Sequence, residues 1–145
     1  MTTRLKTLST LVLLSLVLLP SLAQAGAKEK TYGDVTAVIV SNYDGDTLTV
    51  NIPEYPPVIG EGMKVRVRHV DTPELKSHDP RAVQAKELVE AICPAGTLAV
   101  LRNIGRDMYF RFDADVTCAG KDVATELVNA GLAHAGYEGG TKEAW

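Results

Sequence analysis

Near the start of the chain, one stretch is largely apolar and β-branched, and a second alternates apolar with polar residues; both patterns predict strands. Residues 31–41 are rich in β-branched side chains and predict a first strand. Residues 47–52 alternate strictly and predict a second. Between them, residues 42–45 end in Gly45, which readily adopts the positive φ of a tight turn. The two stretches therefore predict a β-hairpin.

A third stretch, residues 63–70, also alternates, and it follows a loop rich in proline and glycine at residues 53–62. Its parity predicts one face towards the core, with His69 continuing that face as a core or rim residue. The inward residues are Met63, Val65 and Val67, and the outward residues are Lys64, Arg66 and Arg68.

Two helices are predicted after these strands. Asp79 and Pro80 form a helix start, with Asp at the N-cap and Pro at the first helical position. Asp122 is the N-cap of a second helix over residues 123–130, which Gly131 terminates. The first helix ends near Cys93, and its apolar face is Ala82, Ala85, Val89 and Ile92.

Two more strands are predicted between the helices, over residues 97–101 and 109–118, with a charged loop at 104–108. The second of them places Phe110, Phe112, Ala114, Val116 and Cys118 on its inward face.

The order of elements is three strands, a helix, two strands and a helix. This order predicts a mainly β protein with two helices (α+β), namely a five-stranded Greek-key barrel of the OB-fold type. An open α+β sheet is the alternative. The fold by itself does not name a function.

The first 25 residues have the pattern of a secretory signal. Arg4 and Lys6 precede an apolar run, and small residues at 23 and 25 mark a cleavage site before Gly26. We expect a cleaved signal peptide over 1–25, a folded domain over 26–137 and a tail over 138–145. The predicted location is secreted or periplasmic, without stable membrane insertion after cleavage.

Removing Arg4 and Lys6 changes the formal net charge from −3 to −5. An acidic chain argues against bulk, sequence-independent binding of nucleic acid, but it leaves room for a local basic cleft. Cys93 and Cys118 are the two cysteines, and an exported chain favours a disulfide between them over two separate buried thiols.

Two carboxylate-rich turns flank the alternating strands: DGDT at residues 44–47 and DTPE at 71–74. At one mouth of a barrel, Asp46, Asp71 and Glu74 would meet. Oxygen ligands without His or Cys suit a hard cation, Ca²⁺ or Mg²⁺. Each turn alone is equally explained by ordinary turn chemistry.

The order and spacing of several motifs resemble the staphylococcal nuclease (thermonuclease) family over residues 35–137. DGDT at 44–47 is followed by Arg66, four residues and DTPE. Arg111 then lies nine residues before Gly120, and a helix ends in Gly-Leu-Ala at 131–133. The family has the same OB barrel.

The resemblance implies a Ca²⁺-dependent nuclease that cleaves DNA and RNA, preferably unpaired, and leaves 3′-phosphate ends. It implies that Asp46 and Asp71 ligate the metal by side chain and Thr72 by its carbonyl. Glu74 would be the general base, and Arg66 and Arg111 would bind the scissile phosphate. Tyr109 and Tyr137 would line the base pocket. We expect a monomer.

Arg106 is a rival to Arg111 as the second phosphate-binding arginine, because it follows Gly105 as the family's arginine often follows a glycine. Phe110 stands where the family has a small residue. A second functional class therefore stays open: a non-catalytic OB module that binds nucleic acid or a protein.

Overall fold

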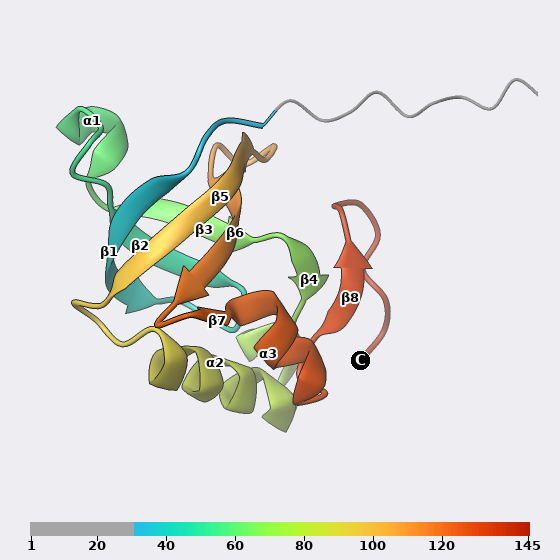
Figure 1. Cartoon of the computed structure of the whole chain (residues 1–145). Helices are drawn as coiled ribbons and strands as arrows, with labels where there is room; N and C mark the ends of the chain where they lie inside the picture. Colours follow the sequence, from blue (N-terminus) through green and yellow to red (C-terminus); the bar gives the residue numbers. More distant parts are fainter. Residues whose placement is uncertain (1–30) are drawn as a thin grey trace, which may run out of the picture.

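Residues 31–145 are described by a computed structural model, in which the alternating stretches pair around a closed barrel (Figure 1). Neighbouring strands follow the order β3-β2-β1-β5-β6, and a parallel pairing of β3 with β6 closes the ring. This confirms the predicted five-stranded OB-type barrel. The five strands are β1 (Val35–Asn42), β2 (Thr47–Asn51), β3 (Met63–Val67), β5 (Leu98–Arg106) and β6 (Phe112–Cys118).

The inward faces of these strands fill the barrel with apolar side chains. β6 alternates buried and half-buried positions along its whole length, as expected for a strand with one face towards the core and one towards solvent. The predicted core residues of β2 and β3 are buried, except that Met63 is partly exposed while still packing on the core. The buried set includes Ile39, Leu48, Val50, Val65, Val67, Leu101 and Val116.

Two helices cover one end of the barrel (Figure 1). α2 (Pro80–Ile92) begins as predicted, because the Asp79 carboxylate accepts a hydrogen bond from the Arg81 N–H. α3 (Val123–Asn129) begins in the same way at Asp122, which caps Thr125. Gly131 follows α3 at φ 68°, a conformation that glycine adopts without strain.

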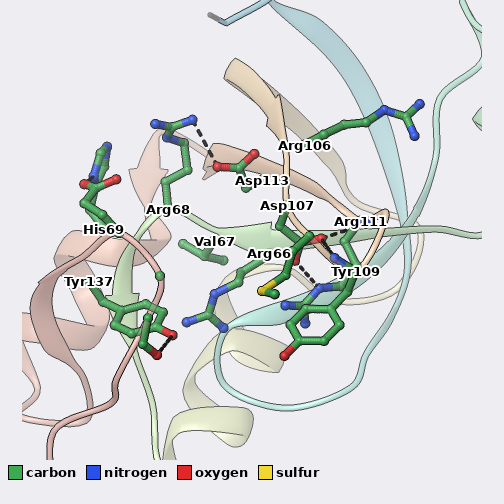
Figure 2. Close-up of a pocket in the computed structure, with 14 residues that line it drawn as sticks. Arg66, Val67, Arg68, His69, Arg106, Asp107, Tyr109, Arg111, Asp113 and Tyr137 are labelled. Atoms are coloured by element: carbon green, nitrogen blue, oxygen red, sulfur yellow. Dashed lines mark hydrogen bonds and ion pairs between the residues drawn. The ribbon is translucent and has the colours of Figure 1, made fainter. Parts of the chain in front are cut away.

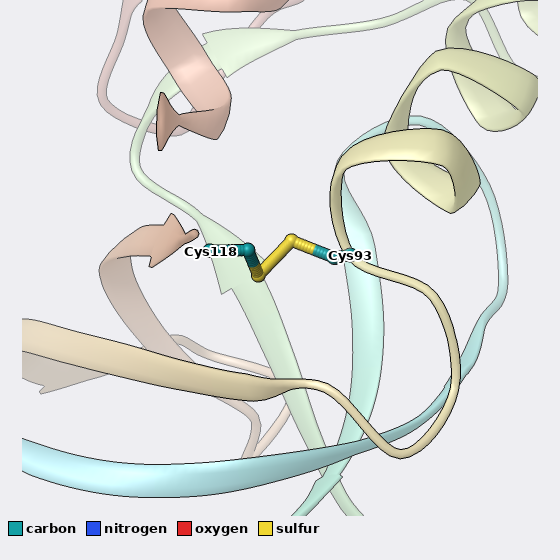
Figure 3. Close-up of a disulfide and its surroundings, with 2 residues drawn as sticks. All are labelled: Cys93 and Cys118. Atoms are coloured by element: carbon teal, nitrogen blue, oxygen red, sulfur yellow. A yellow bond between two sulfur atoms is a disulfide. The ribbon is translucent and has the colours of Figure 1, made fainter. Parts of the chain in front are cut away.

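The disulfide between Cys93 and Cys118 joins the end of α2 to the last residue of β6 (Figure 3). Both cysteines are fully buried, and their Cα atoms lie 5.5 Å apart. The predicted pairing is confirmed. Because it closes a loop of 25 residues, it stabilises the fold by about 3 kcal/mol in the chain-entropy account.

The third predicted strand divides in two, which corrects the expectation for its end. β3 stops at Val67, and a short strand β4 (His69–Asp71) leaves the barrel to pair with β8 (His134–Tyr137). His69 has φ 62°, which breaks the alternation, so its side chain is half exposed and contacts Glu138 instead of the core. The sequence predicted that Arg68 faces the solvent, but its side chain is buried and pairs with Asp113.

The segment between β5 and β6 also differs from the prediction. β5 runs on to Arg106 through a register shift near Asn103, in place of a loop. β6 starts only at Phe112, so residues 109–111 belong to a turn. Phe110 has φ 66° and is 72% exposed, so it does not face inward.

Three smaller elements complete the description. The loop over 53–62 contains one short helix, α1 (Pro57–Gly60), which begins at a proline pair. A 3₁₀ turn, η1 (Leu75–Ser77), precedes α2, and the two-residue β7 (Lys121–Asp122) precedes α3. Within residues 31–145, no helix is long and apolar enough to cross a membrane. The predicted signal segment, residues 1–25, lies outside the described residues.

Candidate active site

Asp46 is the last residue of the β1–β2 turn and is almost completely buried. Its Oδ2 accepts hydrogen bonds from both the N–H and the hydroxyl of Thr72, each at 3.0 Å. Gly45 makes this close approach possible, because a Cβ there would lie 2.6 Å from the Cβ of Ala85 and 2.9 Å from the Thr72 methyl. The first turn is thereby packed against both Thr72 and α2.

Arg66 joins the two carboxylate-rich turns from its place on β3. Its Nη1 donates to Asp46 Oδ1 at 2.7 Å, and its Nη2 donates to the Val70 carbonyl at 3.0 Å and to Asp71 Oδ1 at 3.3 Å. The guanidinium carbon lies 5.0 Å from the ring centre of Tyr137. Only 12% of the Arg66 side chain is exposed, so one buried cation holds two buried anions in place.

Asp71 and Glu74 share a second cation, the ammonium of Lys142. Its Nζ lies 2.8 Å from Asp71 Oδ1 and 2.6 Å from Glu74 Oε1. The hydrogen bond from Lys142 lowers the pKa of Glu74, which keeps that carboxylate ionised. Partial burial acts to lower the pKa of Lys142, but the bonds to both carboxylates outweigh it and raise that pKa. We call Asp46, Arg66, Asp71, Thr72 and Glu74 the carboxylate cluster.

Asp44 is an acidic group beside this cluster to which the sequence assigned no role. Burial, and then the charge of Asp46, raise its pKa to about 6. Its Oδ1 accepts the N–H of Asp46 at 3.1 Å, so Asp44 also shapes the turn that carries Asp46.

A cavity of about 610 Å³ opens beside Arg66 (Figure 2). Arg111, in the turn before β6, lines it and is held by Asp107, whose Oδ2 lies 2.6 Å from the Arg111 Nε. Tyr109 places its ring 5.3 Å from the Arg111 guanidinium carbon. The four arginines on the cavity wall are Arg66, Arg68, Arg106 and Arg111. Such a wall suits an anion with a planar or aromatic group attached.

The predicted site residues fall into two groups. Arg66, Tyr109, Arg111 and Tyr137 line the cavity. Asp46, Asp71, Thr72 and Glu74 do not line it, and Arg66 connects them to it through its hydrogen bonds. Sequence reasoning missed Lys142, because nothing in the sequence around it links the tail to the carboxylates.

The donor chemistry of the carboxylate cluster fits a hard cation. Asp71 Oδ2 is buried and has no hydrogen-bond partner among residues 31–145, which leaves a carboxylate oxygen available as a ligand. The Lys142 ammonium on the other oxygen shows that this position attracts positive charge. Across the same residues, no three His, Cys, Asp or Glu side chains converge into a metal site by themselves. A backbone carbonyl or water must therefore complete any coordination shell.

Comparison with known proteins gives one family. A sequence model described as Staphylococcal nuclease homologue matches residues 64–144, more than half of the chain. The matched stretch includes Arg66, DTPE at 71–74 and Arg111, and it begins after DGDT at 44–47. A search of curated proteins found no match.

Proposed function

The chain belongs to the staphylococcal nuclease family, whose members act on nucleic acids, and we propose that it is an exported, Ca²⁺-dependent nuclease. It cleaves DNA and RNA with little sequence specificity and prefers unpaired strands. One observation carries the proposal: Arg66 links two buried carboxylates to a cavity lined by arginines and tyrosines. That arrangement puts a phosphate-binding group beside a cation-binding group, which suits metal-assisted phosphodiester hydrolysis.

In the proposed reaction a water attacks the phosphorus, and the P–O5′ bond breaks. Glu74 accepts a proton from that water, and the departing O5′ takes up a proton to become a hydroxyl. The product keeps a 3′-phosphate. Glu74 can serve as the base because it is ionised and 46% of its side chain is exposed, so a water can reach it.

Asp46, Asp71 and the carbonyl of Thr72 would hold the Ca²⁺. When bound, the ion supplies positive charge beside the phosphate oxygens. Asp46 is already fixed by Arg66 and Thr72, so its carboxylate needs little reorganisation to act as a ligand. Asp71 would bind through its free Oδ2.

Arg66 and Arg111 would bind the scissile phosphate from two sides of the cavity. A guanidinium can donate two parallel hydrogen bonds to phosphate oxygens, which lysine cannot do. Charge grows on those oxygens during attack, so the arginines stabilise the transition state more than the bound substrate. Tyr109 and Tyr137 would stack on the bases, independently of sequence.

The remaining features concern where and how the protein works. Residues 1–25 would direct export, and the buried disulfide between Cys93 and Cys118 agrees with an oxidising compartment. We propose that the protein works there as a monomer.

A cleavage assay tests the proposal. The purified protein is mixed with single-stranded DNA and with RNA, in Ca²⁺, in Mg²⁺ and in chelator, and the product ends are analysed. We expect Ca²⁺-dependent cleavage that leaves 3′-phosphates. Binding of the nucleic acid without cleavage in any ion would instead establish the alternative, a non-catalytic OB module.

A further inference from the structure

Arg106 differs from the other arginines that line the cavity beside Arg66. Arg66 is ion-paired with Asp46 and Asp71. Arg68 is ion-paired with Asp113, and Arg111 with Asp107. Arg106 is exposed, and residues 31–145 place no carboxylate within ion-pair distance of it. Its positive charge is therefore available to an external anion.

Aromatic rings hold the Arg106 guanidinium in place. Its carbon lies 4.1 Å from the ring centre of Phe110 and 5.4 Å from that of Phe112. Phe110 adopts φ 66° and leaves 72% of its surface exposed, both unfavourable for a phenylalanine. The position of the ring therefore fits a role in supporting Arg106, whose N–H edges stay open to solvent.

Arg106 also lines a second cavity, of about 520 Å³, whose lining does not include Arg66. Tyr55 and Phe112 form an edge-to-face pair in its wall, and Ile59 of α1 completes an apolar surface. Figure 2 shows the Arg106 side chain directed away from Arg66 and Arg68. Arg106 thus reaches an anion other than the one between Arg66 and Arg111.

We propose that Arg106 and this second cavity form a subsite for the neighbouring nucleotide of a single-stranded substrate. Arg106 binds its phosphate, and the aromatic wall accepts its base. The inference rests on the proposed nuclease function. In this proposal Arg106 and Arg111 bind two different phosphates of one strand and are no longer alternatives for the same phosphate. Strands of several nucleotides are then better ligands than a dinucleotide.

Binding measurements on the full chain test the subsite without requiring turnover. In a Glu74→Gln background, competition anisotropy gives the affinities of a thymidine dinucleotide and an octanucleotide from 50 to 200 mM KCl. Arg106→Gln should weaken octanucleotide binding by roughly three- to ten-fold and reduce its salt slope by about 0.7. Dinucleotide binding should change by less than about two-fold, because that ligand does not reach Arg106.

Two matched control variants test whether the effects on binding are specific to the subsite. Arg102→Gln removes the same charge from β5 at an arginine that pairs with Asp34, and it should alter neither ligand. Ile59→Glu places a carboxylate in the cavity wall and should weaken the octanucleotide, whereas Val58→Glu places it on a neighbour that is 88% exposed and should not.

Specific results would overturn the subsite. If Arg106→Gln weakens both ligands equally, Arg106 acts at the scissile phosphate. If it weakens neither, or if Ile59→Glu and Val58→Glu behave alike, the second cavity binds no nucleotide. These results leave the nuclease proposal standing, because cleavage by the wild-type protein is measured separately.

Discussion

The carboxylate cluster and the turn over residues 107–111 both contribute arginines to the candidate site, but they are built differently. Arg66 is 12% exposed and bonds to groups brought together from two separate turns of the chain, at Asp46 and at residues 70–71. Arg111 is 26% exposed, and its ion-pair partner, Asp107, is only four residues away. The position of Arg66 therefore depends on the whole barrel, whereas the position of Arg111 depends on one local turn.

Because the two arginines are held differently, substitutions at them should separate chemistry from folding. A change at Arg66 leaves two nearly buried carboxylates without their shared cation, so folding and activity should fall together. A change at Arg111 or at the exposed Glu74 removes a functional group from the rim. Activity alone should fall there.

Glu74→Gln is expected to have the largest effect, a loss of about 10²–10⁴-fold in kcat, because an amide cannot accept the proton of the attacking water. The melting temperature should hardly change, since Glu74 is half exposed. Steady-state kinetics and thermal melts measure the two effects. Glu87→Gln, on an exposed position of α2, is the matched control. Wild-type turnover by Glu74→Gln would remove Glu74 from the reaction.

Arg66→Lys and Arg111→Lys sharpen the comparison most directly. Each should lower kcat/KM by about 10²-fold, because lysine cannot bind phosphate with a planar pair of donors. Arg66→Lys should also lower the free energy of unfolding by about 2 kcal/mol, through the lost bonds to Asp46 and the Val70 carbonyl. Arg111→Lys should cost less than about 0.5 kcal/mol. Urea denaturation gives both values, and equal losses would contradict the comparison.

Lys142→Met tests whether the carboxylate cluster binds cations. The Lys142 ammonium lies on Asp71 and Glu74, so a metal ion must compete with it. Without that competitor, Ca²⁺ should bind about five-fold more tightly, equivalent to about 1 kcal/mol. Calorimetry with Ca²⁺, or Tb³⁺ luminescence, measures the affinity directly. Lys121→Met, on β7, removes the same charge elsewhere and should change the affinity little; equal effects would mean that only net charge matters.

Asp44→Asn should give the smallest effect, one of pH-dependent stability. The pKa of Asp44 is about 6 in the folded protein, whereas that of a free Asp carboxyl is 3.8. Ionising Asp44 as pH rises through that window therefore destabilises the fold. In chelator, Asp44→Asn should be more stable than wild type by about 1 kcal/mol at pH 7.5 and equal to it at about pH 3, below both pKa values. A gain of the same size at both pH values would show that the carboxyl's charge is not the cause.

Much of the barrel could be predicted, because its signals are local. Strict alternation in residues 47–52 and in β6 defines inward faces wherever they lie. Asp79 and Asp122 cap their helices through residues two or three positions away. The predictions failed at His69 and Phe110, where positive φ interrupts the alternation. Phenylalanine gives no signal of such a conformation in a sequence, and histidine gives only a weak one.

The strand faces and the helix starts could be read from the sequence, since each follows from side chains close together in the chain. The cysteine pair and the order of the charged motifs could also be read from it, although their members lie far apart in the chain. The bonds from Arg66 to both carboxylate turns, and the contacts of Lys142 with Asp71 and Glu74, arise only from tertiary folding. Likewise, only barrel closure placed Arg106 between two cavities. Such contacts join residues up to 71 positions apart, and their energies depend on burial, which no local pattern records.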